Sequence, residues 1–422
     1  MRFRIVTLPA AITGGIVLAA SVFSAPALSQ QLLGQAEWQQ NYDSAQRNQT
    51  TRANTPTLSP DAVTATEQAI IQYSTIVNQG GWGQVSKERL RLGSRGPAVE
   101  ALRQRLVASG DLDASAVHGD IFDSYVEAGL RRAQSRYGLS TTGVLNAGTV
   151  AALNVPADIR LRQLEVNLVR LRSYSGNIGN KYVIVNIPAA VVETVSNNRV
   201  VTRHAAGVGK VDRQSPIFNS KVTEINFNPF WTVPASIIRK DLIPKMRKDP
   251  TYLTDNKIRI FNQQGEELQP SQVDWNTYEA TRYRFRQDPG ADLNSMGFVR
   301  INIPNQYGVY MHDTPAKGIF GDDFRFVSSG CVRLQNVRDY ITFLLEDTPG
   351  WDRNQIQAAI DSGDRIDAPI SNPVPVYWTY ITAWATPDGQ VQFRSDIYNR
   401  DGLGLGGQIA ALEASDSEAS EY

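Results

Sequence analysis

The sequence predicts a multidomain α+β protein in which a small three-helix unit precedes a mostly β domain with a helical insertion. The chain has 422 residues, which is too long for one ordinary hydrophobic core. Hydrophobic spacing is helical between residues 90 and 154 and changes to a period of two from Tyr182 onwards. A basic stretch over residues 237–290 then interrupts the β pattern.

Composition and charge exclude several classes of protein. Hydrophobic residues make up 41% of the chain and charged residues 20%, which excludes a wholly disordered chain, a collagen and a multi-span membrane protein. Lysine and arginine total 42 and equal the 42 acidic residues, so the net charge points to neither nucleic acid nor an anionic membrane as partner. The single cysteine cannot form an intrachain disulfide, and with three histidines it leaves little material for a metal site.

The N-terminus has the pattern of a secretory signal. Arg2 and Arg4 form a short positive region, an uncharged run over residues 5–23 follows, and residues 25–29 offer small side chains at cleavage spacing. We therefore expect residues 1–29 to be removed and the mature protein to be exported to the periplasm or cell envelope. The alternative is an uncleaved anchor, because the run is near the lower length limit for a membrane span.

Residues 30–89 combine a polar lead with one scaffold helix. Residues 30–60 are rich in Gln, Asn and Thr, which predicts a flexible segment. Apolar side chains then recur at helical spacing from residue 61 to 77, until Gly80 and Gly81 stop the pattern.

Residues 90–155 are predicted to form a compact unit of three short helices. Pro97 stands where a first helical residue should, Asp123 can cap the second helix, and the third runs from about residue 146 to 153. A unit of this size with three short helices is typical of a small binding module rather than of an active site.

The rest of the chain divides into a connecting helix, a β domain and a tail. Leucines at helical spacing predict a helix within residues 156–180, and period-two alternation predicts a β domain over 181–370 with further strands over 371–402. The insertion over 237–290 is interpreted as a helical lid near the chemistry or, equally, as a solvated decoration. Residues 403–422 are small and acidic, which predicts a disordered tail.

The residues that can carry chemistry lie between His312 and Cys331. His312 closes a β-like run, and Cys331 follows nineteen residues later in the segment Ser-Ser-Gly-Cys-Val-Arg. A catalytic cysteine reacts as the thiolate, so it needs a base such as His312 nearby, and Arg333 can add positive potential. Gly330 lets the backbone approach a developing oxyanion closely. The alternative is a buried, inert thiol, but this combination favours acyl transfer through a thioester.

The three-helix unit resembles a known family. Its stretch "LRLGSRGPAVEALRQRL…GDIFDSYVEAGLRRAQSRYGL…TGVLNAGTVAAL" is similar to the peptidoglycan-binding helical domain of many cell-wall enzymes. The Leu-Arg-x-Gly-Ser opening and the Tyr-Gly-Leu helix end fit that domain. Individual side chains in the unit are more simply explained as core than as ligand contacts, so no binding residue is assigned.

The segment "YMHDTPAKGIFGDDFRFVSSGCVRLQN" resembles the signature of the L,D-transpeptidases with a YkuD-type catalytic domain. The stretches "NPFWTVPASII" and "FRSDIYNRDG" suggest the larger branch of that family, which carries an N-terminal peptidoglycan-binding helical domain. By this resemblance Cys331 is the acyl-accepting nucleophile and His312 its base. Gly330 and Cys331 would supply the backbone N–H groups of the oxyanion hole, and Arg333 and Ser329 would orient the substrate.

Two positions depart from the family pattern. Ser329 stands where the motif often has a second histidine, and Arg333 stands where it often has asparagine. His312 is therefore left as the only candidate base. Asp313 could orient the imidazole of His312, although a carboxylate beside a strand end is more often a turn residue.

The resemblance implies acyl transfer on peptidoglycan without a metal or organic cofactor. Cys331 would attack a tetrapeptide stem at its third residue and release D-alanine, and the amine of a second stem would resolve the thioester to give a 3→3 cross-link. Peptidoglycan would be the partner, with other cell-wall enzymes as further candidates. The process would be cell-wall biogenesis and the maintenance of cell shape.

Other interpretations keep part of this picture. Water as acceptor would make the protein an L,D-carboxypeptidase, and a protein lysine would make it an anchoring transpeptidase. A non-catalytic peptidoglycan-binding scaffold would rely on residues 90–154 and would not require both His312 and Cys331. A papain-type protease fits less well, because here the histidine precedes the cysteine by a short loop.

Overall fold

The computed structural model describes residues 54–404 except for 175, 177 and 291, and all of these belong to one compact unit, Asn41–Tyr422. The predicted signal over 1–29, most of the predicted flexible lead and nearly all of the acidic tail lie outside the described residues. Within the described part, no helix has the length and apolar character that a membrane crossing needs.

The three helices predicted for the N-terminal unit are present. They are α3 (Pro97–Ala108), α4 (Ser124–Arg136) and α5 (Ala147–Leu153), with a short 3-10 turn η1 (Ala114–Ala116) between the first two. The side chain of Asp123 accepts hydrogen bonds from two backbone N–H groups of the first turn of α4, and that of Asn146 caps α5 by accepting from the Thr149 N–H. The capping residues read from the sequence therefore do set where these helices begin.

A hairpin from the far end of the chain completes the core of this helical unit. The hairpin consists of β14 (Ala383–Ala385) and β15 (Val391–Phe393). The ring of Phe393 packs against Tyr73 and Tyr137 with centroid distances of 5.5 and 6.0 Å. The expected module over residues 90–155 therefore shares its hydrophobic core with residues more than 200 positions later, and with α2 (Pro60–Asn78). The helix α6 (Ala157–Tyr174) packs against α2 and supplies further residues to this core.

Within the described residues the β domain is built on a nine-stranded sheet with the order β11-β3-β12-β10-β9-β4-β13-β1-β2. Its strands are β1 (Lys181–Asn186), β2 (Val191–Ser196), β3 (Arg199–Gly209), β4 (Phe218–Phe227), β9 (Val299–Asn302), β10 (Met311–His312), β11 (Phe326–Ser328), β12 (Val332–Leu334) and β13 (Ile366–Thr379). Because β2 pairs with β3 as well as with β1, the sheet closes on itself. Closure leaves only short strand edges open to solvent.

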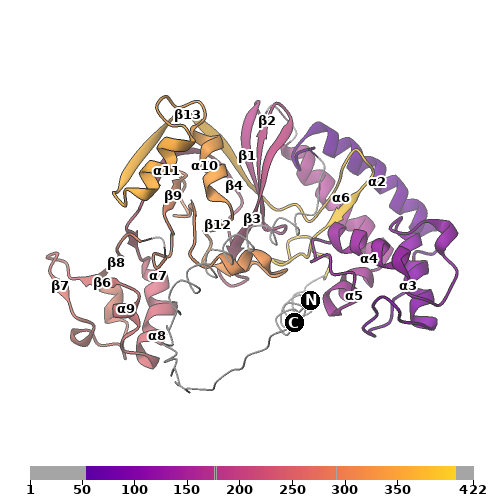
Figure 1. The fold of residues 1–422 in the computed structure, drawn as a ribbon, viewed down its shortest axis with the longest axis horizontal. Helices are drawn as coiled ribbons and strands as arrows, with labels where there is room; N and C mark the ends of the chain where they lie inside the picture. The colour runs from indigo at the N-terminus through magenta and orange to yellow at the C-terminus, as the bar shows by residue number, and fades with distance from the viewer. Residues whose placement is uncertain (1–53, 175, 177, 291, 405–422) are drawn as a thin grey trace, which may run out of the picture. The chain divides into compact units, whose positions relative to one another are not determined.

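Helices α10 (Val337–Leu345) and α11 (Arg353–Asp361) pack on this sheet beside β13 (Figure 1) and contribute to its core cluster. The domain boundary expected between residues 370 and 371 is wrong, because it cuts through β13. That strand pairs with β4 on one side and β1 on the other. Asn372 and Pro373, near the middle of β13, lie at a register shift between Pro369 and Val374, where the strand tolerates them.

The insertion is mixed rather than mostly helical, so that expectation is also corrected. It has its own core cluster and its own sheet with the strand order β5-β8-β6-β7. Its elements are β5 (Trp231–Thr232), α7 (Ala235–Ile237), the π-helical turn η2 (Ile238–Leu242), α8 (Ile243–Lys248), α9 (Tyr252–Asp255), β6 (Ile258–Phe261), β7 (Glu267–Leu268), the 3-10 turns η3 (Pro270–Gln272) and η4 (Glu279–Arg282), and β8 (Arg284–Gln287). The alternation of Ile258 and Ile260 marks a strand, but one too short to stand out from its helical surroundings.

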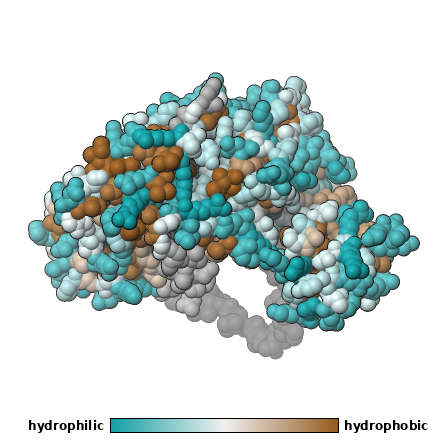
Figure 2. Space-filling view, turned by 180° about the vertical axis from the view of Figure 1, so that it is seen from behind, coloured by the Kyte–Doolittle hydropathy of each residue, from teal (hydrophilic) through white to brown (hydrophobic). Residues whose placement is uncertain are grey.

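Large hydrophobic side chains are gathered in the interior of each part. The sheet, the helical unit and the insertion each have a separate cluster of buried apolar residues. On the face seen in Figure 2, polar side chains cover much of the surface and hydrophobic ones lie in smaller groups between them. This is the pattern of a water-exposed surface around packed cores.

Candidate active site

Three neighbouring strands place the charged and titratable residues of the site in one row. His312 on β10 pairs with Arg333 on β12 and with Arg300 on β9. Side chains alternate between the two faces of a strand, and Met311, which precedes His312, is fully buried in the core. The imidazole therefore lies between two guanidinium groups on the face opposite to the core.

Cys331 lies one position before β12, opposite Tyr310, which lies one position before β10. The backbone N–H of Val332 donates to the Tyr310 carbonyl at 3.0 Å, and the Tyr310 hydroxyl is within hydrogen-bonding reach of the Cys331 thiol. Burial raises the pKa of the Cys331 thiol to about 11, although Tyr310, Arg300 and Arg333 all act in the opposite direction. The resting thiol is therefore protonated at neutral pH, in surroundings that favour its anion once it forms.

His312 is buried and held as a neutral ring. Its Nδ1 lies 2.5 Å from the Asp313 carbonyl oxygen. A carbonyl only accepts hydrogen bonds, so Nδ1 carries the proton and Nε2 carries the lone pair that a base needs. Burial lowers the pKa of His312 to about 3, and the nearby Arg333 acts in the same direction. Among the described residues no hydrogen bond joins His312 to Cys331, as is common for catalytic pairs without substrate.

The field around the thiol is positive. Within the described residues no hydrogen bond or carboxylate partner is recorded for the half-buried Arg333, whose Nε is buried without a partner. The guanidinium of Arg300 lies over the ring of Tyr310, 4.7 Å from its centroid. Asp313 does not orient the imidazole with its carboxylate, which instead pairs with Lys317. A substrate with a carboxylate near its reactive carbonyl fits this distribution of charge.

The loop before Cys331 changes one expectation about the oxyanion hole. The backbone N–H of Gly330 donates to Ser328 Oγ at 3.1 Å, so it is already used within the loop. Among the described residues no partner is recorded for the N–H of Cys331. Of the two predicted donors, the structure therefore leaves the Cys331 N–H available and not that of Gly330. The hydroxyl of Tyr310, on the same side of the thiol, is the other donor near Cys331.

Comparison with known sequences agrees with this geometry. Residues 180–351, which contain this row and the thiol, match the family described as "L,D-transpeptidase catalytic domain". The chain contains an L,D-transpeptidase catalytic domain. Residues 95–153, which cover α3 to α5, match the family described as "Putative peptidoglycan binding domain". The resemblance read from the sequence is thereby confirmed, as is the multidomain α+β fold class.

The chain also has a curated relative. A Haemophilus influenzae protein named "Putative L,D-transpeptidase" is 31% identical over 219 residues, which is 52% of this chain and 44% of that protein. The chain thus spans less than half the length of the relative it matches.

Solved L,D-transpeptidase structures are more distant. One from Xylanimonas cellulosilytica is 15% identical, covers 70% of this chain and 100% of its own, and has a TM-score of 0.23. One from Mycobacterium smegmatis is 12% identical, covers 47% and 58%, and has the same score. Scores this low carry no argument about this chain, so the family assignment rests on the sequence matches.

The insertion of the transpeptidase domain contacts the nucleophile region at two places. The indole of Trp231, in the first strand of the insertion, lies close enough to the Tyr310 hydroxyl to lower its pKa. Asp241, on η2, forms an ion pair with Arg213 at 2.5 Å, and Arg213 also donates to Ser329 Oγ at 2.9 Å. Ser329, predicted to orient the substrate, is therefore held by a residue that links the insertion to the nucleophile loop.

Several residues of the site were not predicted from the sequence. Tyr310 shares the strand face of His312 two positions earlier, so period-two alternation could have placed it there. Arg300 and Arg213 belong to other strands and loops, and no local pattern marks them. Among the described residues, no group of three His, Cys, Asp or Glu side chains could hold a metal ion. The absence of a cofactor remains a prediction.

Proposed function

We propose that this protein is an L,D-transpeptidase that makes 3→3 peptidoglycan cross-links through a thioester on Cys331. The observation that carries the proposal is the arrangement of side chains on the neighbouring strands β9, β10 and β12. The Cys331 thiol, with the Tyr310 hydroxyl at its side, lies next to the His312 imidazole, whose Nε2 is unprotonated. That imidazole lies between the guanidinium groups of Arg300 and Arg333.

In the first half-reaction, Cys331 attacks the carbonyl of the third stem residue. Its proton passes to Nε2 of His312, and the charge that develops on the carbonyl oxygen is met by the Cys331 N–H and the Tyr310 hydroxyl. The amide bond to the terminal D-alanine breaks, and the proton on His312 goes to the leaving amine. Arg333 and Arg300, whose charges act on the Cys331 thiol, would bind stem carboxylates at this stage.

In the second half-reaction, the side-chain amine of an acceptor stem attacks the thioester. His312 takes a proton from that amine and returns it to the sulfur as the C–S bond breaks. A new amide bond then joins the third residues of two stems, and the thiol is regenerated. Water in place of the amine would give a carboxypeptidase, so keeping water out favours cross-linking.

The other parts of the chain serve this reaction. The helical unit would hold the enzyme on glycan or stem peptide and raise the local substrate concentration. The insertion, which reaches Tyr310 through Trp231, would cover the donor and limit access of water. The proposed site of action is the periplasm after removal of residues 1–29, where the enzyme would contribute to cell-wall biogenesis and cell shape beside other cell-wall enzymes.

The test is mass spectrometry of the purified full chain incubated with a disaccharide-tetrapeptide, beside Cys331→Ala. We expect a cross-linked dimer and free D-alanine, both absent with the variant. Tripeptide without dimer would indicate a carboxypeptidase instead. No turnover combined with retained binding to isolated peptidoglycan would indicate the scaffold. If Cys331→Ala turns over as fast as the natural chain, the thioester mechanism is wrong.

A further inference from the structure

Loop 210–215, which follows β3, supports the segment that leads to the nucleophile. Hydrogen bonds join the two segments: Lys210 N–H to the Ser328 carbonyl at 3.0 Å, Arg213 Nη1 to Ser329 Oγ at 2.9 Å, and Ser215 Oγ to the Gly330 carbonyl at 2.9 Å. The contacts thus reach each of the three residues before Cys331.

Ser215 is the most constrained of these partners. It is fully buried, and its Oγ accepts a hydrogen bond from the Gly209 N–H at 2.9 Å while donating to the Gly330 carbonyl. A hydroxyl has one proton to donate, so this pair of contacts fixes its direction. A side chain at position 209 would overlap the Arg213 carbonyl and the Ser215 nitrogen, which shows how tightly the loop folds back on β3.

The contact to Gly330 determines where the Cys331 N–H points. The carbonyl of Gly330 and the N–H of Cys331 belong to one planar peptide unit and point in opposite directions. Fixing the carbonyl oxygen therefore fixes the N–H. Gly330 has a φ of 114°, in a region that glycine adopts without strain, so its own backbone leaves other orientations open. The hydrogen bond from Ser215 selects one of them.

Tyr398, nearly 70 residues after the nucleophile, holds Ser215 in place. Its hydroxyl accepts a hydrogen bond from the Ser215 N–H at 3.2 Å and donates to the Gly209 carbonyl at 2.5 Å. Arg400 adds a second link by donating to Gln214 at 2.8 Å. The end of β3 and loop 210–215 are thus tied to the C-terminal segment 396–401.

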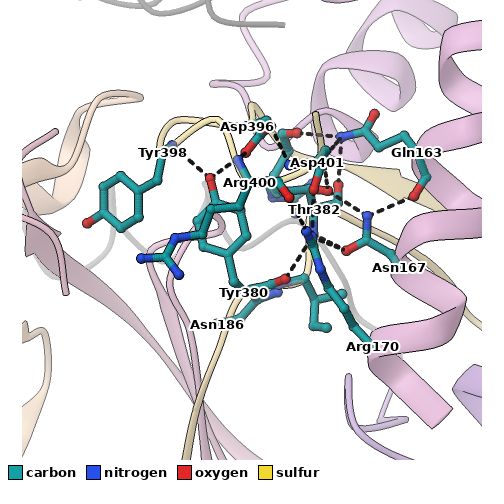
Figure 3. A network of polar contacts seen from close by, with 12 residues as sticks. Gln163, Asn167, Arg170, Asn186, Tyr380, Thr382, Asp396, Tyr398, Arg400 and Asp401 are labelled. Atoms are coloured by element: carbon teal, nitrogen blue, oxygen red, sulfur yellow. Dashed lines mark hydrogen bonds and ion pairs between the residues drawn. The ribbon is translucent and has the colours of Figure 1, made fainter. Parts of the chain in front are cut away.

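That segment is itself anchored to α6 by the network in Figure 3. The Tyr398 N–H donates to the Tyr380 hydroxyl at 2.8 Å, and this hydroxyl donates to Asp396 at 2.7 Å. Asp396 also accepts the N–H of Asp401, whose carboxylate pairs with Arg170 of α6 at 2.6 Å. The series of contacts runs without interruption from α6 to the peptide unit of the nucleophile.

We propose that Ser215 and Tyr398 are positioning residues that aim the Cys331 N–H at the substrate oxyanion. Segment 396–401 is then part of the catalytic apparatus, although it lies outside the sheet. This inference rests on the proposed acyl transfer through Cys331. It can be tested separately from that proposal. An N–H donor stabilises the oxyanion of a tetrahedral intermediate, but it has no part in a displacement at carbon, because that reaction forms no oxyanion.

The test compares two reactions of Cys331 in the full chain: acylation by p-nitrophenyl acetate, which passes through an oxyanion, and alkylation by iodoacetamide, which does not. We expect Ser215→Ala to slow acylation about 10- to 100-fold through the maximal rate rather than KM, and Tyr398→Phe about 10-fold. Alkylation should stay within about twofold. Matched controls are Ser59→Ala and Tyr182→Phe, which remove buried hydroxyl contacts far from the site and should change neither reaction.

Equal loss of acylation and alkylation would mean a general disturbance of the loop and would overturn the inference. Unchanged acylation in Ser215→Ala would overturn it too. The outcome for the peptide donor is separate. If the natural chain fails to turn over disaccharide-tetrapeptide while the ratio of acylation to alkylation falls in both variants, the proposed function fails and the positioning role stands.

Discussion

The most informative single substitution in the site is Tyr310→Phe. It removes one oxygen and keeps the ring, so Arg300 retains its stacking partner. The lost hydroxyl lies close to the Cys331 thiol and the indole of Trp231, and it acts on the pKa of the thiol. Because that hydroxyl lowers the pKa of Cys331, its removal should raise this pKa and reduce the thiolate fraction at any fixed pH.

The size of the effect follows from the charge of the acceptor. A hydrogen bond to an ionised group contributes about 1.5–3 kcal/mol, which corresponds to a loss of about 10- to 150-fold in the rate of thiolate reactions. The cost in stability should be smaller. The indole of Trp231 loses a nearby polar group, at about 1 kcal/mol in the free energy of unfolding, or about 2–4 °C in Tm for a domain of this size.

The assay follows iodoacetamide alkylation and donor turnover by the full chain, with thermal unfolding as a check. Tyr182→Phe is the control, since its buried hydroxyl donates to the Leu58 carbonyl at 2.9 Å away from the site. We expect alkylation to slow in Tyr310→Phe and to be unchanged in the control. An alkylation rate equal to that of the natural chain would refute the assigned contact between the hydroxyl and the thiol.

Other measurable outcomes follow from the same structure. Alkylation of Cys331 should still be rising with pH at about pH 10, because burial raises the thiol pKa to about 11; a plateau near neutral pH would indicate a thiolate–imidazolium pair instead. Burial lowers the pKa of His204 to about 4. Between pH 6.5 and 4, His204 is therefore protonated in the unfolded chain but remains neutral in the folded chain. Denaturant unfolding should then show stability falling by about 3 kcal/mol between pH 6.5 and 4, and less in His204→Gln. Phe393→Ala should cost about 3–5 kcal/mol and speed hydrogen exchange in α4, whereas Phe393→Leu should cost less.

The parts of the fold that the sequence could predict are those with local causes. Asp123 and Pro97 define helix starts because capping and proline geometry act within one turn. Asn197 and Asn198 form the turn between β2 and β3 in the left-handed conformation that asparagine tolerates, which is a local cause of the same kind. His312 and Cys331 could be chosen for their chemistry, and the structure places His312 on β10 and Cys331 directly before the adjacent strand β12.

What could not be predicted depends on contacts between distant segments. β14 and β15 are strands of only three residues, and nothing in their sequence shows that they complete the core of the helical unit. Ser215 is one serine in a polar loop, and its role comes from Gly330, 115 positions later. Gly330 was expected to donate to the oxyanion because glycine permits close approach, but Ser328, two residues earlier, takes its N–H.

Arg333 makes the Cys331 thiol more acidic but the His312 base weaker, and this determines when the proton moves between them. Its charge lowers the pKa of Cys331, which favours the thiolate, and lowers the pKa of His312, which makes the base weaker. In the resting site burial dominates both groups and keeps them neutral. A stem carboxylate that pairs with Arg333 would cancel its charge. His312 then becomes a stronger base, while the thiol loses only one of the smaller influences that lower its pKa. The thiol proton can then move to His312 as sulfur attacks, and the unliganded site does not hold a free thiolate exposed to oxidation.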